Sequence, residues 1–247
     1  MKADHSHQLA LLEVQTLDTR ADQLRHQRRT LPALAAITEL EARRGELVDQ
    51  ARDAKVLVDD LTTEQEKVDA DVEQVKARRT RDRERMDSGA ISSPKDLERM
   101  SGELESLERR INTLEEEELE VMERLEAAQG MLDSLNTQVG EVEGRIAEHV
   151  AERDARFAEI DAQLVDVEAQ RGPSVEGLPE DLLALYEKLR TSKGGVGAAG
   201  LAQRRCSGCQ LGLDASEIER FRKAADDDVL RCEECSRILV RTAEAGI

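Results

Sequence analysis

Aromatic side chains are nearly absent from this chain of 247 residues. Tryptophan is missing, and Phe157, Tyr186 and Phe221 are the aromatic residues, about 1% of the sequence. A globular core of this length would be hard to fill with so few large apolar side chains. Charged residues make up 36% of the chain, and Ala, Glu, Arg and Leu are abundant. This composition favours an extended helical rod over a conventional globular domain.

Cysteine is absent from the first 205 residues, and the remaining segment contains four cysteines. They form two pairs, CSGC and CEEC, at Cys206, Cys209, Cys232 and Cys235. Thiolates two residues apart can present both sulfurs to one tetrahedral centre, and two such pairs describe a closed zinc site. We therefore predict one structural Zn²⁺ ion bound by the four cysteines.

Two disulfides or a redox CxxC are the alternative interpretations of the same residues. Disulfides need an oxidising compartment, yet no apolar stretch follows the opening MKADHSHQLA to act as a signal peptide. A redox CxxC normally follows a βαβ pattern, whereas a glycine run precedes Cys206. A shell of four sulfurs leaves no position for a reactive water, and no nucleophile and base are suggested elsewhere. The prediction is therefore a protein without enzymatic activity.

Apolar residues recur every seven positions through the centre of the chain. Nine of eleven positions are apolar in the series Leu97, Leu104, Ile111, Glu118, Leu125, Leu132, Val139, Ile146, Arg153, Ile160 and Val167. A companion series begins three residues later at Met100 and Leu107, and an earlier segment repeats the pattern at Leu40, Leu47 and Leu61. Such spacing is typical of a coiled-coil seam.

A short connection separates the two periodic segments. The sequence MDSGAISSPKDL contains a glycine that ends one helix and a Ser-Pro pair that begins the next. A connection this short implies antiparallel neighbours. We predict a hairpin over residues 1–170 with its tip near 87–94. Pairing about position 91 or 92 places residue 61 opposite 122, and Pro32 predicts a kink or a register change in both arms at its level.

The segment after the second arm is predicted to be a linker, residues 171–200. It opens with a break, RGPSVEGLP, and contains a short amphipathic helix over 179–192. The zinc ribbon is predicted over 201–247. The fold class is thus mainly α, a long antiparallel coiled-coil hairpin with a small C-terminal β zinc ribbon.

These features together resemble a family of bacterial coiled-coil proteins with a C-terminal C4-type zinc ribbon. The matching segments are LLEVQTLD at Leu11 to Asp18, Leu31-Pro32, the SPKDL tip, CSGCQLGL from Cys206 and CEECSRIL from Cys232. The resemblance implies a helical hairpin with the ribbon at its open end and no enzymatic activity. It also implies partners of the kinds that relatives bind: an alternative sigma factor, flagellar or secretion components, or a flagellin mRNA.

Charge bears on whether nucleic acid is a partner. The net charge is −18, which repels phosphate over the molecule as a whole. Residues 201–241 hold eight basic and eight acidic side chains and are neutral. A basic run, KARRTRDRER, precedes the tip, whereas the acidic run EEEELE is expected near residues 64–69. The candidate partner-binding residues are Arg204, Arg205, Arg220, Arg222 and Lys223 at the ribbon, and Arg78, Arg79, Arg81, Arg83 and Arg85 at the tip.

An adaptor that binds protein partners, in transcription regulation or secretion by resemblance, is the function that the sequence favours. Nucleic-acid binding through the ribbon or the basic tip is the alternative, but few aromatics are available to stack on bases. No apolar run is long enough to cross a membrane, and thiols kept for zinc suit a reducing cytoplasm. The sequence therefore predicts a cytoplasmic location without membrane insertion.

Overall fold

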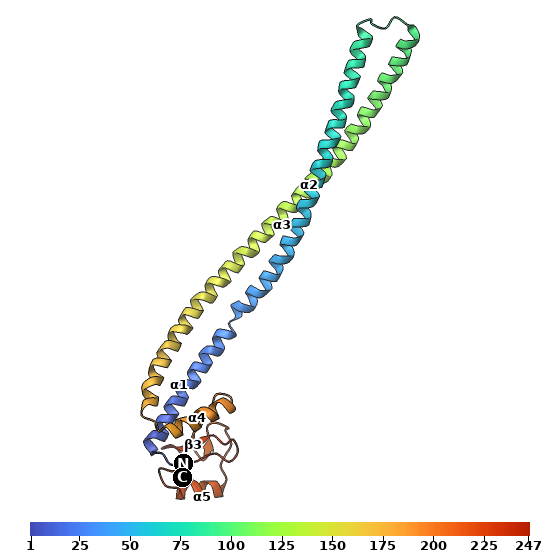
Figure 1. Ribbon diagram of the computed structural model, residues 1–247. Coiled ribbons are helices and arrows are strands. Elements are labelled where there is room, and N and C mark those ends of the chain that lie inside the picture. Colours follow the sequence, from blue (N-terminus) through green and yellow to red (C-terminus); the bar gives the residue numbers. More distant parts are fainter. The chain divides into compact units, whose positions relative to one another are not determined.

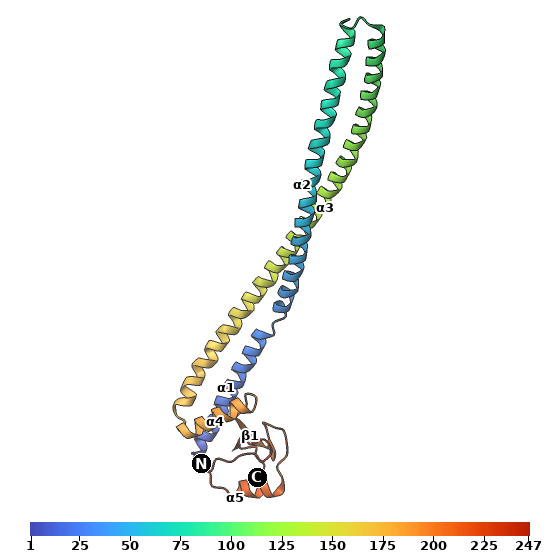
Figure 2. The same cartoon turned by 45° about the vertical axis from the view of Figure 1, so that its right-hand side comes forward.

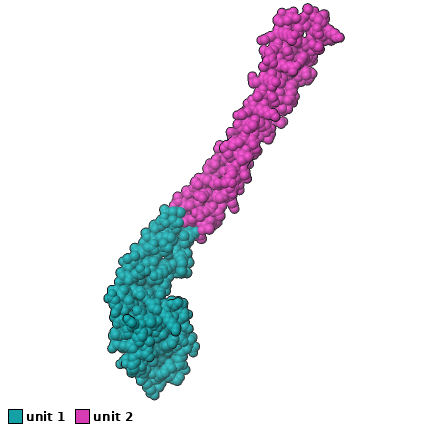
Figure 3. Space-filling model, in the orientation of Figure 1, with its two compact units in different colours: residues 1–34, 150–247 teal, residues 35–149 magenta.

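The computed structural model describes residues 1–247 and confirms a mainly α-helical chain with a small C-terminal sheet. The chain divides into two compact units (Figure 3). One unit, which we call the hairpin unit, is residues 35–149, and the other, the ribbon unit, is residues 1–34 with 150–247. The elements are α1 (His5–Arg29), α2 (Pro32–Asp87), α3 (Pro94–Glu176), α4 (Glu180–Ser192), β1 (Ala198–Ala202), β2 (Arg205–Cys206), α5 (Ala215–Lys223) and β3 (Ile238–Arg241).

The hairpin unit contains most of α2 and the part of α3 up to residue 149, and the two helices run side by side in opposite directions from their connection (Figure 1). The residues at the seven-residue spacing are the ones that the two helices bury. Leu47, Leu61, Ile111 and Leu114 are at most 3% exposed. The predicted seam is therefore the core of this unit, and its helices are stabilised by burial of one apolar stripe each.

The pairing register of the hairpin differs from the register expected for a turn at position 91 or 92 by three to six residues, which is one to two helical turns. Leu61 packs with Ala128 and Leu125 rather than opposite residue 122. Leu47 packs with Val142 in the same register. The midpoint of the connecting segment gives only an approximate register, because packing of the apolar layers determines which residues meet.

Proline acts on the two arms differently. The helix of the first arm is interrupted between Arg29 and Pro32, where the Thr30 amide and hydroxyl both donate to the carbonyl of His26. The second arm has no interruption at that level, where α3 is continuous. The predicted break at 171 is also wrong: α3 continues through Pro173 to Glu176. Pro173 lacks an amide hydrogen and removes one hydrogen bond of the helix, which ends three residues later.

The ribbon unit contains a three-stranded sheet with the order β2-β1-β3. β1 pairs antiparallel with β2 and parallel with β3, with Ala198 opposite Ile238. β1 therefore begins three residues before the predicted start of the ribbon, inside the predicted linker. Helices α1 and α4 lie beside the sheet (Figure 2).

Alternate residues of the strands face opposite sides of this sheet. Ala198, Ile238 and Val240 pack with Leu11 and Val14 of α1 and with Leu182, Tyr186 and Leu189 of α4. Ala199, Leu201 and Leu239 pack on the other side with Cys206, Cys232 and Phe221. This period of two is what a strand buried on both faces requires. The sheet thus joins the helices to the cysteine site. None of the helices combines the length and apolar composition that crossing a bilayer requires.

Candidate metal centre

The two CxxC segments fold into turns of the same geometry. In the first, the amide of Gln210 donates to the carbonyl of Cys206 over 2.8 Å, and Gln210 has a φ of 64°. In the second, the amide of Ser236 donates to Cys232 over 2.9 Å, and Ser236 has a φ of 62°. The backbone of each segment therefore reverses directly after the second cysteine. This turn directs both sulfurs of the pair to the same side.

The four sulfurs converge on one point. Cys206 Sγ lies 3.9 Å from Cys235 Sγ, and Cys209 Sγ lies 3.9 Å from Cys232 Sγ. All four sulfurs lie within 4.8 Å of one another. Four sulfurs at the Zn–S bond length of about 2.3 Å in a tetrahedron are ~3.8 Å apart. The cluster therefore fits one structural zinc ion, as the sequence predicted.

The thiols differ in how readily they ionise before a metal binds. Burial raises the pKa of Cys206 to about 12 and also raises the pKa of Cys232. For Cys235, burial opposes ionisation, but hydrogen bonds from the backbone of Arg237 and from neighbouring thiols lower the pKa to about 7. Zinc binding must release protons from these groups, and metal occupancy therefore depends on pH.

Arg237 holds the first cysteine turn against the glycine segment that precedes β1. Its guanidinium donates to the carbonyls of Lys193, Val196 and Gly208 at 2.9, 2.9 and 3.2 Å. A Cβ at Gly208 would lie 2.9 Å from the Arg237 side chain and 3.0 Å from Ala199. The glycine of CSGC is thus required by close packing, which explains this residue better than chain flexibility does.

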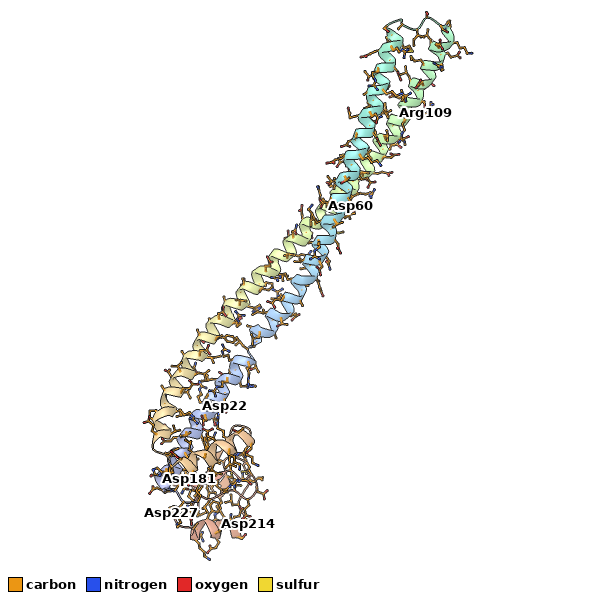
Figure 4. The ribbon with its side chains drawn as sticks, viewed as in Figure 1. Asp22, Asp60, Arg109, Asp181, Asp214 and Asp227 are labelled. Atoms are coloured by element: carbon orange, nitrogen blue, oxygen red, sulfur yellow. The ribbon has the colours of Figure 1, made fainter.

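Helix α5 supports the second cysteine turn. Asp214, labelled in Figure 4, caps the helix by accepting from the amide of Glu217 over 2.8 Å. Glu217 is buried and accepts from its own cap and from the amide of Glu233, between Cys232 and Cys235. Phe221 of the same helix is fully buried beside the cysteines. The capping box therefore connects the helix start to the metal centre.

A second feature of the ribbon unit is a group of buried polar side chains on α1. Gln15 accepts the amide of Gly197 over 2.7 Å and donates to the carbonyl of Gly195 over 3.0 Å. Gln8 donates to the carbonyls of Ala3 and Asp226 at 2.9 and 3.2 Å. These amide groups satisfy backbone atoms of segments that would otherwise be buried without partners. They join the N-terminal helix to the glycine segment before β1 and to the loop after α5.

Asp18 lies at the centre of a charged network between α1, α3 and α4. Its side chain is 5% exposed, accepts from Arg171 and from the Tyr186 hydroxyl at 2.7 Å each, and lies 3.5 Å from Arg190. Burial opposes its ionisation, but the bonds from Arg171 and Tyr186 outweigh it and lower the pKa of Asp18. Burial and the adjacent carboxylate raise the pKa of Tyr186.

Sequence reasoning missed these α1 residues as structural connectors. Gln8, Leu11, Gln15 and Asp18 follow the alternating three- and four-residue spacing of a seam, yet three of the four are polar. Polar residues at core positions of a helix usually have specific buried partners, and that was the available signal.

The predicted basic residues of the ribbon mostly bind groups of the ribbon itself. Arg220 pairs with Glu233, and Glu219 pairs with both Arg222 and Lys223, at 3.1 and 3.2 Å. Arg204 donates to the carbonyl of Gly246 over 3.0 Å. Arg205 is exposed. Arg204 and Arg222 line one surface hollow together with Glu219, and Arg220 lines another beside Cys232.

Some of the predicted basic residues near the tip form ion pairs with α3, and the others are exposed. Arg78 pairs with Glu103, and Arg79 with Glu108 at 2.8 Å. Lys76 pairs with Glu115 at 2.7 Å, so the acidic run contacts the basic run. Pairing about position 91 or 92 predicts the acidic run near residues 64–69 instead. Arg81, Arg83 and Arg85 are exposed, and Arg85 lines a polar hollow with Ser93 and Arg99. The basic run is therefore partly neutralised by α3.

Comparison with known proteins identifies the two parts of the chain. Residues 14–194 match the CT398-like coiled coil hairpin domain, and residues 205–239 match a C4-type zinc ribbon domain. An uncharacterized protein of Mycobacterium tuberculosis is 32% identical over 241 residues, which are 98% of each chain. Neither matched family is a family of enzymes.

Solved structures share this architecture. A Mycobacterium smegmatis protein, 35% identical, has a TM-score of 0.85 over 98% of this chain and 100% of its own. CT398 from Chlamydia trachomatis, 18% identical, has a TM-score of 0.70 over 96% and 98%. The matches and the four clustered sulfurs agree. The chain belongs to the family of CT398-like coiled-coil hairpin proteins with a C4-type zinc ribbon.

Proposed function

We propose that the protein is a non-enzymatic adaptor that binds a protein partner through its zinc ribbon. The coiled-coil hairpin is the second structural part of this adaptor. The observation that carries this proposal is the state of the basic side chains of the ribbon. Arg220, Arg222 and Lys223 pair with carboxylates of the same ribbon. Three of the five candidate cations of the ribbon therefore have a carboxylate beside them, which lowers the positive charge that phosphate would meet there.

The metal centre supports a structural role for zinc in this adaptor. Four thiolates would complete a tetrahedral shell and leave no position for substrate or water. The ion would hold the two cysteine turns and α5 in shape, and so preserve the surface around them. A reducing compartment such as the cytoplasm keeps the thiols available for the metal. The family resemblance directs the search for the partner to transcription and secretion machinery.

The proposal is tested by two assays on the intact chain and on the Cys232→Ser variant. Affinity capture is expected to recover a protein partner with the zinc-loaded chain and to lose it with the variant. Gel-shift titration against DNA and RNA is expected to show no retardation at physiological salt. Salt-sensitive retardation of nucleic acid by the intact chain, together with equal capture by both proteins, would favour the nucleic-acid alternative.

A further inference from the structure

A hollow of about 460 Å³ interrupts the surface of the hairpin unit, between α2 and α3. Ala54 and Leu135 belong to its lining on the side of the seam, and Leu57 and Met131 belong to its outer lining. Ala54 is buried, whereas the side chains of Leu57 and Met131 are 45% and 58% exposed. The small alanine at a seam position leaves the hollow that larger seam residues fill elsewhere.

Leu57 and Met131 occupy heptad positions that carry a charged pair one heptad away. Seven residues along each helix, Glu64 and Arg124 form an ion pair across the hairpin at 3.3 Å. Positions that flank a two-helix seam ordinarily carry charges of this kind. Leu57 and Met131 instead leave apolar area in water, which is what a site for a further helix requires.

The charges around the hollow indicate which net charge a helix bound there would carry. Residues 46–67 and 121–142 contain eleven acidic and four basic side chains, a net charge of −7. Asp49 and Asp59 pair with Arg52 and Lys55 on α2. Asp53 lines the hollow, and Asp60 lies on the same helix in the hairpin unit (Figure 4). Both carboxylates are exposed and are left for an outside partner.

We propose that this hollow docks a basic amphipathic helix of a partner protein. The apolar side chains of the helix would enter between Leu57 and Met131, whose flexible thioether adapts to different shapes. Lysine or arginine on its flanks would meet Asp53 and Asp60. On the α3 side, Ala127 and Ser134 are exposed and small, so the backbone of the incoming helix can approach closely. This inference rests on the proposed adaptor function and adds a second binding surface to it.

The test measures binding of a designed peptide to the intact, zinc-loaded chain. The peptide is about three heptads long, with leucine on one face and lysine on both flanks. Fluorescence anisotropy compares it with a scrambled peptide of identical composition, which controls for attraction to a chain of net charge −18. The ordered peptide is expected to bind about tenfold more tightly or better than the scrambled peptide.

Matched variants locate the binding. Leu57→Gln with Met131→Gln is expected to remove the preference for the ordered peptide. Val56→Gln with Leu119→Gln, which alter side chains 55% and 59% exposed outside the hollow, is expected to preserve it. Asp53→Asn with Asp60→Asn is expected to flatten the salt dependence more than Asp49→Asn with Asp59→Asn. Circular dichroism confirms that each variant remains folded.

Three results would overturn the inference. Equal binding of ordered and scrambled peptides removes the helical specificity, and equal binding by the Leu57/Met131 variant removes the site. A concentration-dependent dimer of the chain alone that the Leu57/Met131 variant abolishes would assign the hollow to a second copy. The Cys232→Ser variant is expected to bind the peptide normally, so failure of ribbon-dependent capture and failure of this site are separate outcomes.

Discussion

The hairpin unit and the ribbon unit are each stabilised internally by a different set of interactions. The core of the hairpin unit is a repeated apolar stripe, with Leu47, Val58 and Leu61 buried on α2. The buried polar and charged residues Gln8, Gln15, Asp18 and Glu217 all lie in the ribbon unit. One unit therefore depends on many similar layers, whereas the other adds a few specific polar groups and four sulfurs that fit a metal ion to its apolar clusters.

This difference changes how each unit responds to substitution. Loss of one layer from a long seam removes a fraction of the apolar burial and leaves its neighbours paired. Loss of a ligand or of a buried charge leaves several partners unsatisfied at once. The largest effects of single substitutions are therefore expected in the ribbon unit.

The largest effect is expected at the metal centre. Cys232→Ser should lower the zinc content from about one equivalent to near zero, because the variant lacks one of the four thiolates that complete the tetrahedral shell. Elemental analysis of protein purified without added metal checks this. Acidification should also release the ion, because protons compete for the thiolates. One equivalent of tightly held zinc in the variant would contradict a four-cysteine site.

The next effect is expected at Asp18. Asp18→Asn should destabilise the ribbon unit by about 3 kcal/mol, because Arg171 and Arg190 lose a buried counter-charge. Urea unfolding measures the change, and Asp22→Asn is the control: its carboxylate is 40% exposed and pairs with Arg190 at 2.7 Å. That control should cost less than about 1 kcal/mol.

The dependence of this effect on pH follows from the lowered pKa of Asp18. The unfolded carboxyl titrates near 4, above the folded value, so the unfolded state binds more protons between them. The advantage of the native protein over Asp18→Asn should be complete above about pH 5 and should decline as the pH falls through the folded pKa. An advantage that grows on acidification would contradict the network.

A moderate effect is expected in the hairpin seam. Leu61→Ala should cost about 2–4 kcal/mol, because it leaves a cavity beside Ala128, where the partner is already small. Val56→Ala on the exposed face of the same helix should change stability by less than about 0.5 kcal/mol. Thermal unfolding followed by circular dichroism compares the two. Equal losses would show that the seam is not the core.

The smallest effect is expected for the ion pair of Glu64 and Arg124. Both side chains are about half exposed, at 46% and 57%. A double-mutant cycle with alanine at both positions should give a coupling energy of about 0.2–1 kcal/mol, which high salt reduces. A coupling above about 2 kcal/mol would place part of the stability of the hairpin in its surface charges.

The sequence predicted the hairpin unit better than the ribbon unit for a physical reason. A seam repeats one interaction, so a pattern such as Leu97, Leu104 and Ile111 identifies it, although the register needs the packed layers. Spacing also identified the four cysteines. The contacts of Gln15 with Gly197, or of Arg237 with Gly208, join residues distant in sequence and repeat nowhere. No period in the chain encodes them, so they required the structure.

The most direct test of the contrast between the units is residue-resolved amide hydrogen exchange of the intact, zinc-loaded chain before and after chelation. Chelation is expected to remove protection from the amides of the cysteine turns, such as Gln210 and Ser236, and to weaken it in β1 and β3. Amides of α2 and α3 between residues 40 and 142 should keep their protection. Loss of protection in both units together, or in neither, would contradict the account that the ribbon depends on the metal and that the hairpin folds on its own seam.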